Sequence, residues 1–419
     1  MSRARRYGSC LLLCAAAQSS LAGGFLDDAQ SSLLARNYLL HSDSRNSPGQ
    51  SLRREWAQGF IASWQSGYSA GPVGVGLEAQ AFAGFKLDGG RGHTGTGLLP
   101  RDSDGASANR YATAGAALKL RYAASTLRYG EMRVQTPVFA TGDKRLQPEY
   151  ARGALLQSDD LPGLRLQAGR FSAFRNQDGS SSHAEFSGYG ASTRGAGISL
   201  IGVELGADQP AGAAFYASQL DDNWRQYYFN LHQQIHGLRL DAHYYRTHDW
   251  GQARAGRIDT QAWSLAGAYG HGAQRLTLGY QQIDGDTPFD FVGGDSIALA
   301  NAIKYADFNG PGERSWQLRY DLDLSAWTLP GLSLMTRYVR GSQIDGSHAP
   351  ATGAYAGQYG RGGRHWERDS ELRYVVPSGP ARDLSLSLAH VSHRGNSAQP
   401  GTDLDRLYLV IEWPFTGLF

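Results

Sequence analysis

Six basic residues lie in segments where apolar and polar residues alternate, and each is on the polar parity. They are Lys119, Arg121, Arg128, Arg319, Arg337 and Arg373. Successive side chains of a β-strand point to opposite faces, so all six could face the inside of a closed sheet. A guanidinium stays charged and binds a carboxylate through two hydrogen bonds, and a row of weak sites can pass such a ligand along. The alternative for each residue is snorkelling at an interface or pairing with a neighbouring carboxylate.

The elements that must position these residues are β-strands. The clearest example runs from residue 316 to 324, where one parity is apolar and the other is Gln317, Arg319, Asp321 and Asp323. Similar stripes begin at Leu118, Leu238, Trp263 and Leu276. Their apolar faces carry aromatic residues near the ends and their opposite faces carry charge, which favours a membrane barrel over a soluble sandwich or propeller. A barrel also explains a mean hydropathy of −0.42, because the two faces average out.

Short turns and long loops separate the strands. Pro162-Gly163, His236-Gly237 and Pro330-Gly331 predict tight turns, whereas residues 88–109 and 341–363 read as long loops. Alternation of short and long connections is typical of outer-membrane barrels. The chain contains no run of 18 apolar residues, which argues against transmembrane helices.

The N-terminus has the features of a secretory signal peptide. A basic segment with Arg3, Arg5 and Arg6 precedes a short apolar stretch and then small residues. We expect a signal peptide over residues 1–22, with cleavage after Ala17 or Ala22, and a barrel over residues 23–419. Cleavage leaves 37 basic residues against 38 acidic ones and removes both cysteines. The mature chain therefore has no basic excess that would suggest nucleic-acid binding.

The C-terminus is the sharpest local signal. Its apolar residues fall on one parity up to the last residue: Leu407, Leu409, Ile411, Trp413, Phe415 and Phe419. A final strand with a terminal aromatic resembles the signal that the barrel-assembly machinery reads. An ordinary edge strand is the alternative.

Several blocks together resemble the OprD-type (porin D-like) family of outer-membrane carboxylate channels. Residues 293–297 read Gly-Gly-Asp-Ser-Ile, residues 307–313 read Asp-Phe-Asn-Gly-Pro-Gly-Glu, and residues 330–346 follow a third block with Leu334 where the pattern has Phe. The resemblance covers the mature chain and is closest to the basic-amino-acid branch. It implies an all-β, 18-stranded antiparallel transmembrane barrel in the outer membrane of a Gram-negative bacterium, with a loop folded inward to form a narrow eyelet.

The same resemblance assigns candidate site residues. Arg36 joins the six basic residues above as a basic ladder along the substrate pathway. Residues 136–153 would form the inward loop, with Arg145 and Phe139 at the eyelet. Asp295 and Ser296 would hold the cationic pole of a solute, although Asp295 beside two glycines also suits a turn. Lesser acidic candidates are Asp307 and Asp321.

The expected solutes are basic amino acids, small peptides and related antibiotics such as carbapenems, with cyclic or aromatic carboxylates as the alternative within the family. Other expected partners are outer-membrane lipid, lipopolysaccharide and the assembly machinery, and the barrel is a monomer or a loose trimer. A different class, a barrel hydrolase using Ser296, requires a triad that adjacency to Asp295 does not provide. His390 and His393 would lie on opposite faces of a strand, so no metal is expected, and no cofactor either.

Overall fold

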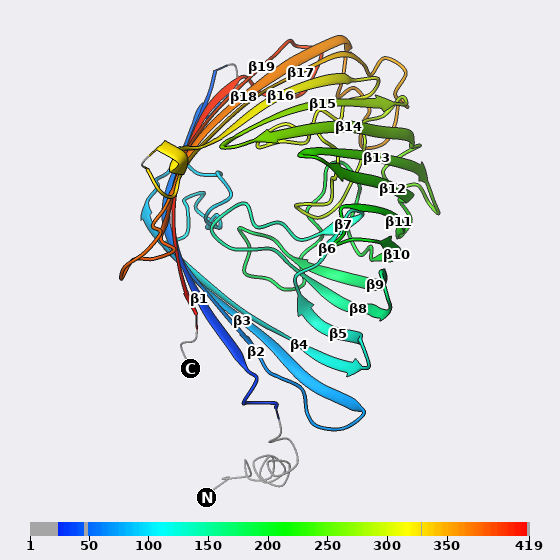
Figure 1. Ribbon diagram of the computed structural model, residues 1–419. Coiled ribbons are helices and arrows are strands. Elements are labelled where there is room, and N and C mark those ends of the chain that lie inside the picture. Colours follow the sequence, from blue (N-terminus) through cyan, green and yellow to red (C-terminus); the bar gives the residue numbers. More distant parts are fainter. Residues whose placement is uncertain (1–23, 46–48, 328, 417–419) are drawn as a thin grey trace, which may run out of the picture.

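The computed structural model describes residues 24–45, 49–327 and 329–416, and eighteen of its strands form one closed antiparallel sheet (Figure 1). The predicted signal peptide, with its cleavage site, and the aromatic terminus at Phe419 lie outside these residues. The strands of the barrel are β1 (Gln30–Ser44), β2 (Leu52–Gln65), β3 (Val73–Asp88), β4 (Arg110–Tyr122), β5 (Ser125–Met132), β8 (Tyr150–Leu161), β9 (Leu164–Arg175), β10 (Ile198–Leu205), β11 (Ala211–Leu220), β12 (Trp224–Ile235), β13 (Leu238–Asp249), β14 (Asp259–His271), β15 (Gln274–Asp284), β16 (Arg314–Asp323), β17 (Leu332–Asp345), β18 (Arg361–Val375), β19 (Ser385–Gly395) and β20 (Leu404–Thr416).

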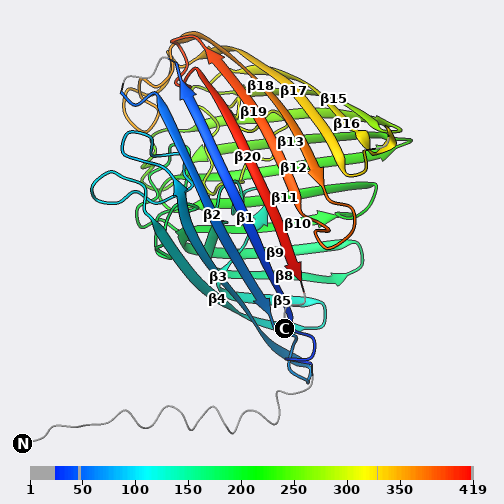
Figure 2. The ribbon, with the colours of Figure 1, turned by 90° about the vertical axis from the view of Figure 1, so that its left-hand side faces the viewer.

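The barrel closes between its first and last strands. β1 pairs with β2 on one side and with β20 on the other, from Ser32 opposite Thr416 to Ser44 opposite Leu404 (Figure 2). Closure leaves no unpaired edge, which is the condition for placing β-strands in hydrocarbon. The predicted 18-stranded antiparallel barrel is confirmed.

Connections at one end are mostly short, and those at the other end include the long ones. The predicted turn at His236-Gly237 joins β12 to β13, and both residues have positive φ (+47° and +84°), as two-residue type I′ turns require. At the other end lie segments 89–109, 133–149, 176–197, 285–313 and 346–360. The predicted loop boundaries need correction in two places. β8 begins at Tyr150, which ends the inward loop before residue 153, and a bulged β17 extends to Asp345.

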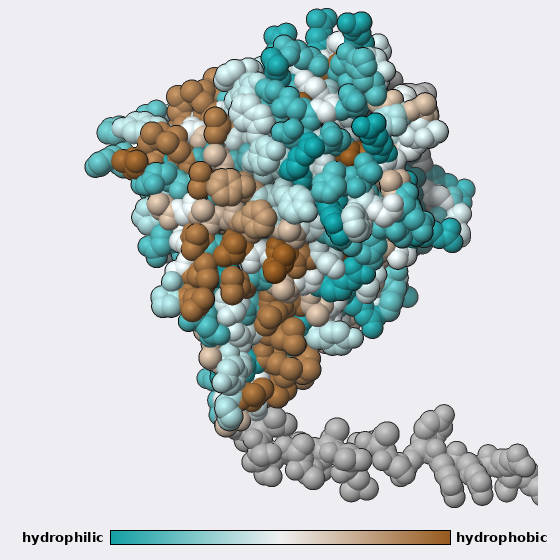
Figure 3. Space-filling view, turned by 90° about the vertical axis from the view of Figure 1, so that its right-hand side faces the viewer, coloured by the Kyte–Doolittle hydropathy of each residue, from teal (hydrophilic) through white to brown (hydrophobic). Residues whose placement is uncertain are grey.

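The outer surface is apolar where the alternation predicted it. Leu265, Leu278 and Leu318 are each more than half exposed, on the parity opposite the charged residues. Figure 3 shows such side chains gathered on one part of the face and hydrophilic ones covering the rest. None of the helices among the described residues is long and apolar enough to cross a membrane.

The interior is partly filled by the long loops. Segment 133–149 contains the small hairpin β6 (Gln135–Thr136) and β7 (Phe139–Ala140), which lies inside the ring of strands in Figure 1. Two apolar clusters hold loops against the wall, one around Phe139 and one around Leu98, Leu99 and Leu146. Cavities remain beside β1 and β17–β20 and beside β10–β13.

Candidate functional site

The candidate site is a cavity of about 530 Å³ between the inward loops and one side of the barrel wall. The wall contributes side chains from β1, β17, β18, β19 and β20, and the loops contribute residues of segments 133–149 and 285–313. Its charged lining consists of Arg36, Asp143, Lys144, Arg145, Asp295, Lys304, Arg337, Glu371, Arg373 and Glu412, together with the aromatic residues Tyr38 and Tyr408.

Phe139 attaches the inward loop to the barrel wall through aromatic contacts. Its ring is wholly buried, with centroids 5.0 Å from Phe171, 6.1 Å from Phe174 and 5.3 Å from Phe186. Aromatic contacts of this kind add to the burial of apolar surface. The prediction that Phe139 lines the eyelet is therefore wrong, because its side chain packs against β9 and segment 176–197.

Glu149 joins three loops through one buried carboxylate. Its Oε2 accepts hydrogen bonds from the backbone N–H of Gly142 (2.7 Å) and Gly294 (2.9 Å), and its Oε1 accepts one from Ser187 (3.2 Å). Burial raises the pKa of Glu149, although these donors and Lys144 oppose the rise. A Cβ at Gly294 would lie 2.2 Å from Glu149 Oε2, so this close approach needs glycine.

Ser296 belongs to the same junction between loops. Its hydroxyl accepts a hydrogen bond from Ala140 N (2.7 Å) and donates one to Ala140 O (3.3 Å), and the residue is wholly buried. This corrects its expected place at the eyelet and leaves no exposed hydroxyl for hydrolysis. The adjacent Asp295 does line the cavity, where its carboxylate pairs with Lys144 at 2.7 Å.

Arg36 fixes the inward loop to the seam of the barrel, where the first strand β1 pairs with the last strand β20. Its guanidinium donates to Glu412 on β20 and to Asp143 on the loop, both at 2.7 Å, and to the carbonyl of Arg145 at 2.7 Å. Burial alone would raise the pKa of Asp143, but Arg36 and Arg133 hold it below its ordinary value. Only 5% of Arg36 is exposed, so its charge is committed to these contacts.

Six basic and four acidic residues line the cavity, which leaves two positive charges in excess. Most of the cations have a carboxylate partner: Arg36 as above, Arg337 with Asp369 at 2.7 Å, Lys144 with Asp295, and Lys304 with Glu371 at 2.6 Å. Within the described part of the chain, Arg145 and Arg373 form no ion pair. These two guanidinium groups are therefore the lining cations whose charge is left for a ligand.

Two backbone carbonyl groups hold the guanidinium of Arg145. Its Nε donates to Thr96 O at 3.1 Å, and its Nη1 donates to Lys144 O at 2.8 Å. Thr96 is in turn fixed by the wholly buried carboxylate of Glu55, which accepts bonds from its N–H and its hydroxyl. Carbonyl groups orient a guanidinium without neutralising it, so Arg145 keeps its charge for an anionic ligand.

The remaining members of the predicted ladder occupy the end of the barrel with short connections. Arg319 pairs with Asp321 at 2.6 Å in a second cavity of about 400 Å³, which Glu371 and Arg373 also line. On the other wall, Arg121 stacks on the ring of Tyr68 at 4.2 Å, and Arg128 lies 3.8 Å from Glu78. Lys119 faces inward as its parity predicts. It is 95% covered, however, and its amine donates to Ser66 O at 3.0 Å.

Several lining residues escaped the sequence analysis. The alternation on β18 would have indicated Glu371, because it lies between Asp369 and Arg373 on one parity. Asp143, Lys144 and Lys304 lie in irregular loops, where no periodicity indicates which side chains face the lumen.

Comparison with known proteins assigns this architecture to a family. The family model described as outer membrane porin, OprD family, matches residues 23–417. The chain belongs to the OprD family of outer membrane porins. It is similar to Porin D of Pseudomonas aeruginosa, with 40% identity over 411 residues that cover 94% of this chain and 92% of Porin D. The predicted resemblance is confirmed, and the porin is a protein of the Gram-negative outer membrane.

Solved structures from Pseudomonas aeruginosa have the same fold. OccK9 (OpdG) superposes on this porin with a TM-score of 0.86 at 33% identity, covering 94% of this chain and all of OccK9. OpdK, solved with vanillate, gives 0.85 at 37% identity with the same coverage. Family and fold are those of porins, which are channels for small solutes.

Replacing Glu149 by Ala should destabilise the junction of the inward loops in this porin. The change leaves the N–H groups of Gly142 and Gly294 without their acceptor, and each buried unpaired donor costs about 1–3 kcal/mol. We expect larger and noisier single-channel currents in planar bilayers, while Glu149→Gln should stay closer to wild type. Exposed Glu185 on segment 176–197 provides the control, Glu185→Ala. Quiet, wild-type currents from Glu149→Ala would contradict this role.

The cation preference of this porin should rise with pH through Asp307. Burial is the main cause that raises the pKa of Asp307 to about 6. The positive charge of Lys144 lowers this pKa, and the negative charge of Asp295 raises it. The carboxyl is therefore neutral below that pH and negative above it, near the ion pair of Asp295. The ratio of potassium to chloride permeability should increase between pH 5 and 7.5. Asp307→Asn should remove that step, and an unchanged titration in this variant would contradict the assignment. Asp290→Asn is the control variant, because burial also raises the pKa of Asp290 to about 6. It shows whether the loss of any buried carboxyl with this pKa removes the step, or only the loss of Asp307.

Proposed function

We propose that this porin carries small carboxylate-bearing solutes across the outer membrane by diffusion. The observation that carries the proposal is a pair of cations, Arg145 and Arg373, which line this cavity and form no ion pair with any residue that the structure describes. A guanidinium in a low-dielectric wall binds a carboxylate more strongly than water would allow, and two such groups can share or pass on the ligand. The other two arginines of the lining, Arg36 and Arg337, are already paired with carboxylates.

Basic amino acids are the favoured solutes, followed by small peptides and related antibiotics such as carbapenems. Two carboxylates in the same cavity, Asp295 and Glu371, each form an ion pair with a lysine, and Glu371 also bonds the hydroxyl of Ser387. Lysine makes a point contact on a flexible stem, so these carboxylates suit exchange with the cationic group of a solute. A solute with both poles could thus contact both kinds of site in one cavity.

Cyclic or aromatic carboxylates are the second candidate. This alternative rests on OpdK, whose solved structure contains vanillate and whose sequence is 37% identical to this chain. Such solutes need the arginines and do not need Asp295 or Glu371. Transport of arginine and benzoate therefore separates the two candidates.

The partners we propose follow from this function. Apart from the solutes, they are the lipid and lipopolysaccharide around the barrel and the assembly machinery that inserts it. We propose no catalysis, because Ser296 has its hydroxyl bonded to Ala140, and no nucleic-acid partner or cofactor. One barrel contains the whole cavity, so a monomer and a loose trimer would function alike.

Uptake by proteoliposomes tests the function. We expect a stable, small, solute-blockable current in planar bilayers and faster uptake of arginine than of benzoate. Arg145→Ala should widen the opening, raise conductance and lower the preference for arginine over argininamide about two- to fivefold, the range expected for a partly exposed ion pair. Arg91→Ala, on an exposed part of segment 89–109, is the control.

Three outcomes would contradict parts of this proposal. A silent protein would contradict the channel. Faster uptake of benzoate with exclusion of arginine would select the aromatic alternative. Unchanged conductance and selectivity in Arg145→Ala would remove this residue from the eyelet.

A further inference from the structure

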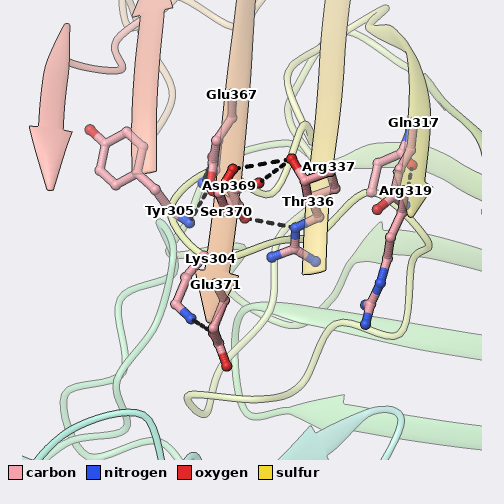
Figure 4. Close-up of polar contacts among 12 residues, drawn as sticks. Lys304, Tyr305, Gln317, Arg319, Thr336, Arg337, Glu367, Asp369, Ser370 and Glu371 are labelled. Carbon is pink, nitrogen blue, oxygen red and sulfur yellow. Dashed lines mark hydrogen bonds and ion pairs between the residues drawn. The ribbon is translucent and has the colours of Figure 1, made fainter. Parts of the chain in front are cut away.

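Lys304 and Glu371 form an ion pair inside the cavity of about 530 Å³, which is called the opening below. This pair is more exposed to the lumen than the pair of Arg337 with Asp369. Lys304 Nζ lies 2.6 Å from Glu371 Oε2, and the side chains are 28% and 22% exposed (Figure 4). Both residues line the cavity. By contrast, Asp369 is wholly buried beneath Arg337. The Lys304–Glu371 pair is thus in contact with the solute pathway.

The backbone beside Lys304 is fixed independently of this pair. The N–H groups of Tyr305 and Ala306 donate to the buried carboxylate of Glu367 at 2.9 and 2.7 Å. Glu367 and Glu371 lie on the same face of β18, four residues apart. The loop therefore stays attached when the lysine side chain moves. The ring of Tyr408 lies 5.4 Å from Lys304 Nζ and can hold a displaced ammonium through a cation–π contact.

Glu371 also occupies the junction of two cavities. It and Arg373 line both the opening and the second cavity beside Arg319. Arg373 follows two residues later on the same face of β18 and has no ion-pair partner among the described residues. Glu371 and Arg373 thus place a carboxylate and a guanidinium in adjacent inward positions, which match the cationic and anionic groups of an amino acid. In the structure, the carboxylate of Glu371 is bound by Lys304.

We propose that Lys304 is a tethered competitor, which occupies Glu371 until the ammonium or guanidinium of a solute displaces it. This proposal rests on the proposed function and specifies how cationic solutes are selected. A solute guanidinium can replace one lysine contact by two hydrogen bonds. Its carboxylate can bind Arg373 in the same step, so that the ammonium of Lys304 replaces Arg373 as the cation without a carboxylate partner. When the solute leaves, Lys304 returns to Glu371, which prevents the site from holding the cation too tightly.

Substitutions at Lys304 with opposite effects on Glu371 test the exchange. Half-blocking concentrations of arginine and benzoate are measured on single channels in planar bilayers. Lys304→Met removes the competitor and should lower the concentration for arginine about two- to fivefold, as expected for a partly exposed pair. Lys304→Arg keeps the charge but grips Glu371 with two bonds, so it should raise that concentration. Glu371→Gln should abolish the gain when combined with Lys304→Met.

The double variant Lys304→Met/Glu371→Gln is the control for charge, because it also lacks the cation of Lys304 but has no carboxylate to free at this position. In Lys304→Met alone, block by benzoate should weaken while block by arginine tightens. Arginine block that tightens equally in the double variant, or that is unaltered by Lys304→Met and Lys304→Arg, would overturn the exchange and leave the proposed function intact. A wild-type channel that neither solute blocks would remove the proposed function and the exchange together.

Discussion

One guanidinium, that of Arg36, connects the two features that create the opening. It lies on β1, where the barrel closes, and bonds both Glu412 on β20 and Asp143 on the inward loop. Buried charges need such complete pairing, since removing one partner leaves an uncompensated charge and typically costs several kcal/mol. The loop held in this way forms one side of the cavity of about 530 Å³, and the wall of β1 and β17–β20 forms the other side. Arg36, which joined the predicted ladder by the family resemblance and not by alternation along its strand, therefore has a structural role.

The loops cross the lumen because their polar groups are satisfied inside it. Glu149 accepts N–H groups from two loops, Glu55 fixes Thr96, and Glu367 fixes the backbone beside Lys304. Each carboxylate is buried and bonded to backbone N–H groups, an arrangement that orders an irregular segment without regular secondary structure. The apolar packing of Phe139 on β9 completes the attachment. These contacts fix the loops around the cavity that Arg145 and Arg373 line.

Strands were predictable from the sequence because their information is local. A two-residue period places Arg319, Arg337 and Arg373 inside and Leu278 outside, and each position needs only its neighbours to be assigned. The loop residues depend on contacts distant in sequence, so the same reasoning fails there. Phe139 and Ser296 resemble eyelet residues in their motifs, yet each is buried by a partner from another segment. Lys304 has no periodic context at all, and only its proximity to Glu371, 67 residues away, reveals its position.

The proposed function requires a solute carboxylate to bind in the cavity at Arg145 and Arg373. A crystal structure of the protein soaked with arginine would show where that carboxylate lies. The expected result is the solute carboxylate within hydrogen-bond distance of one or both of these guanidinium groups. Solute bound only at the opposite wall, beside Glu204 and Asp241 of the cavity under β10–β13, with Arg145 and Arg373 unoccupied, would contradict this requirement.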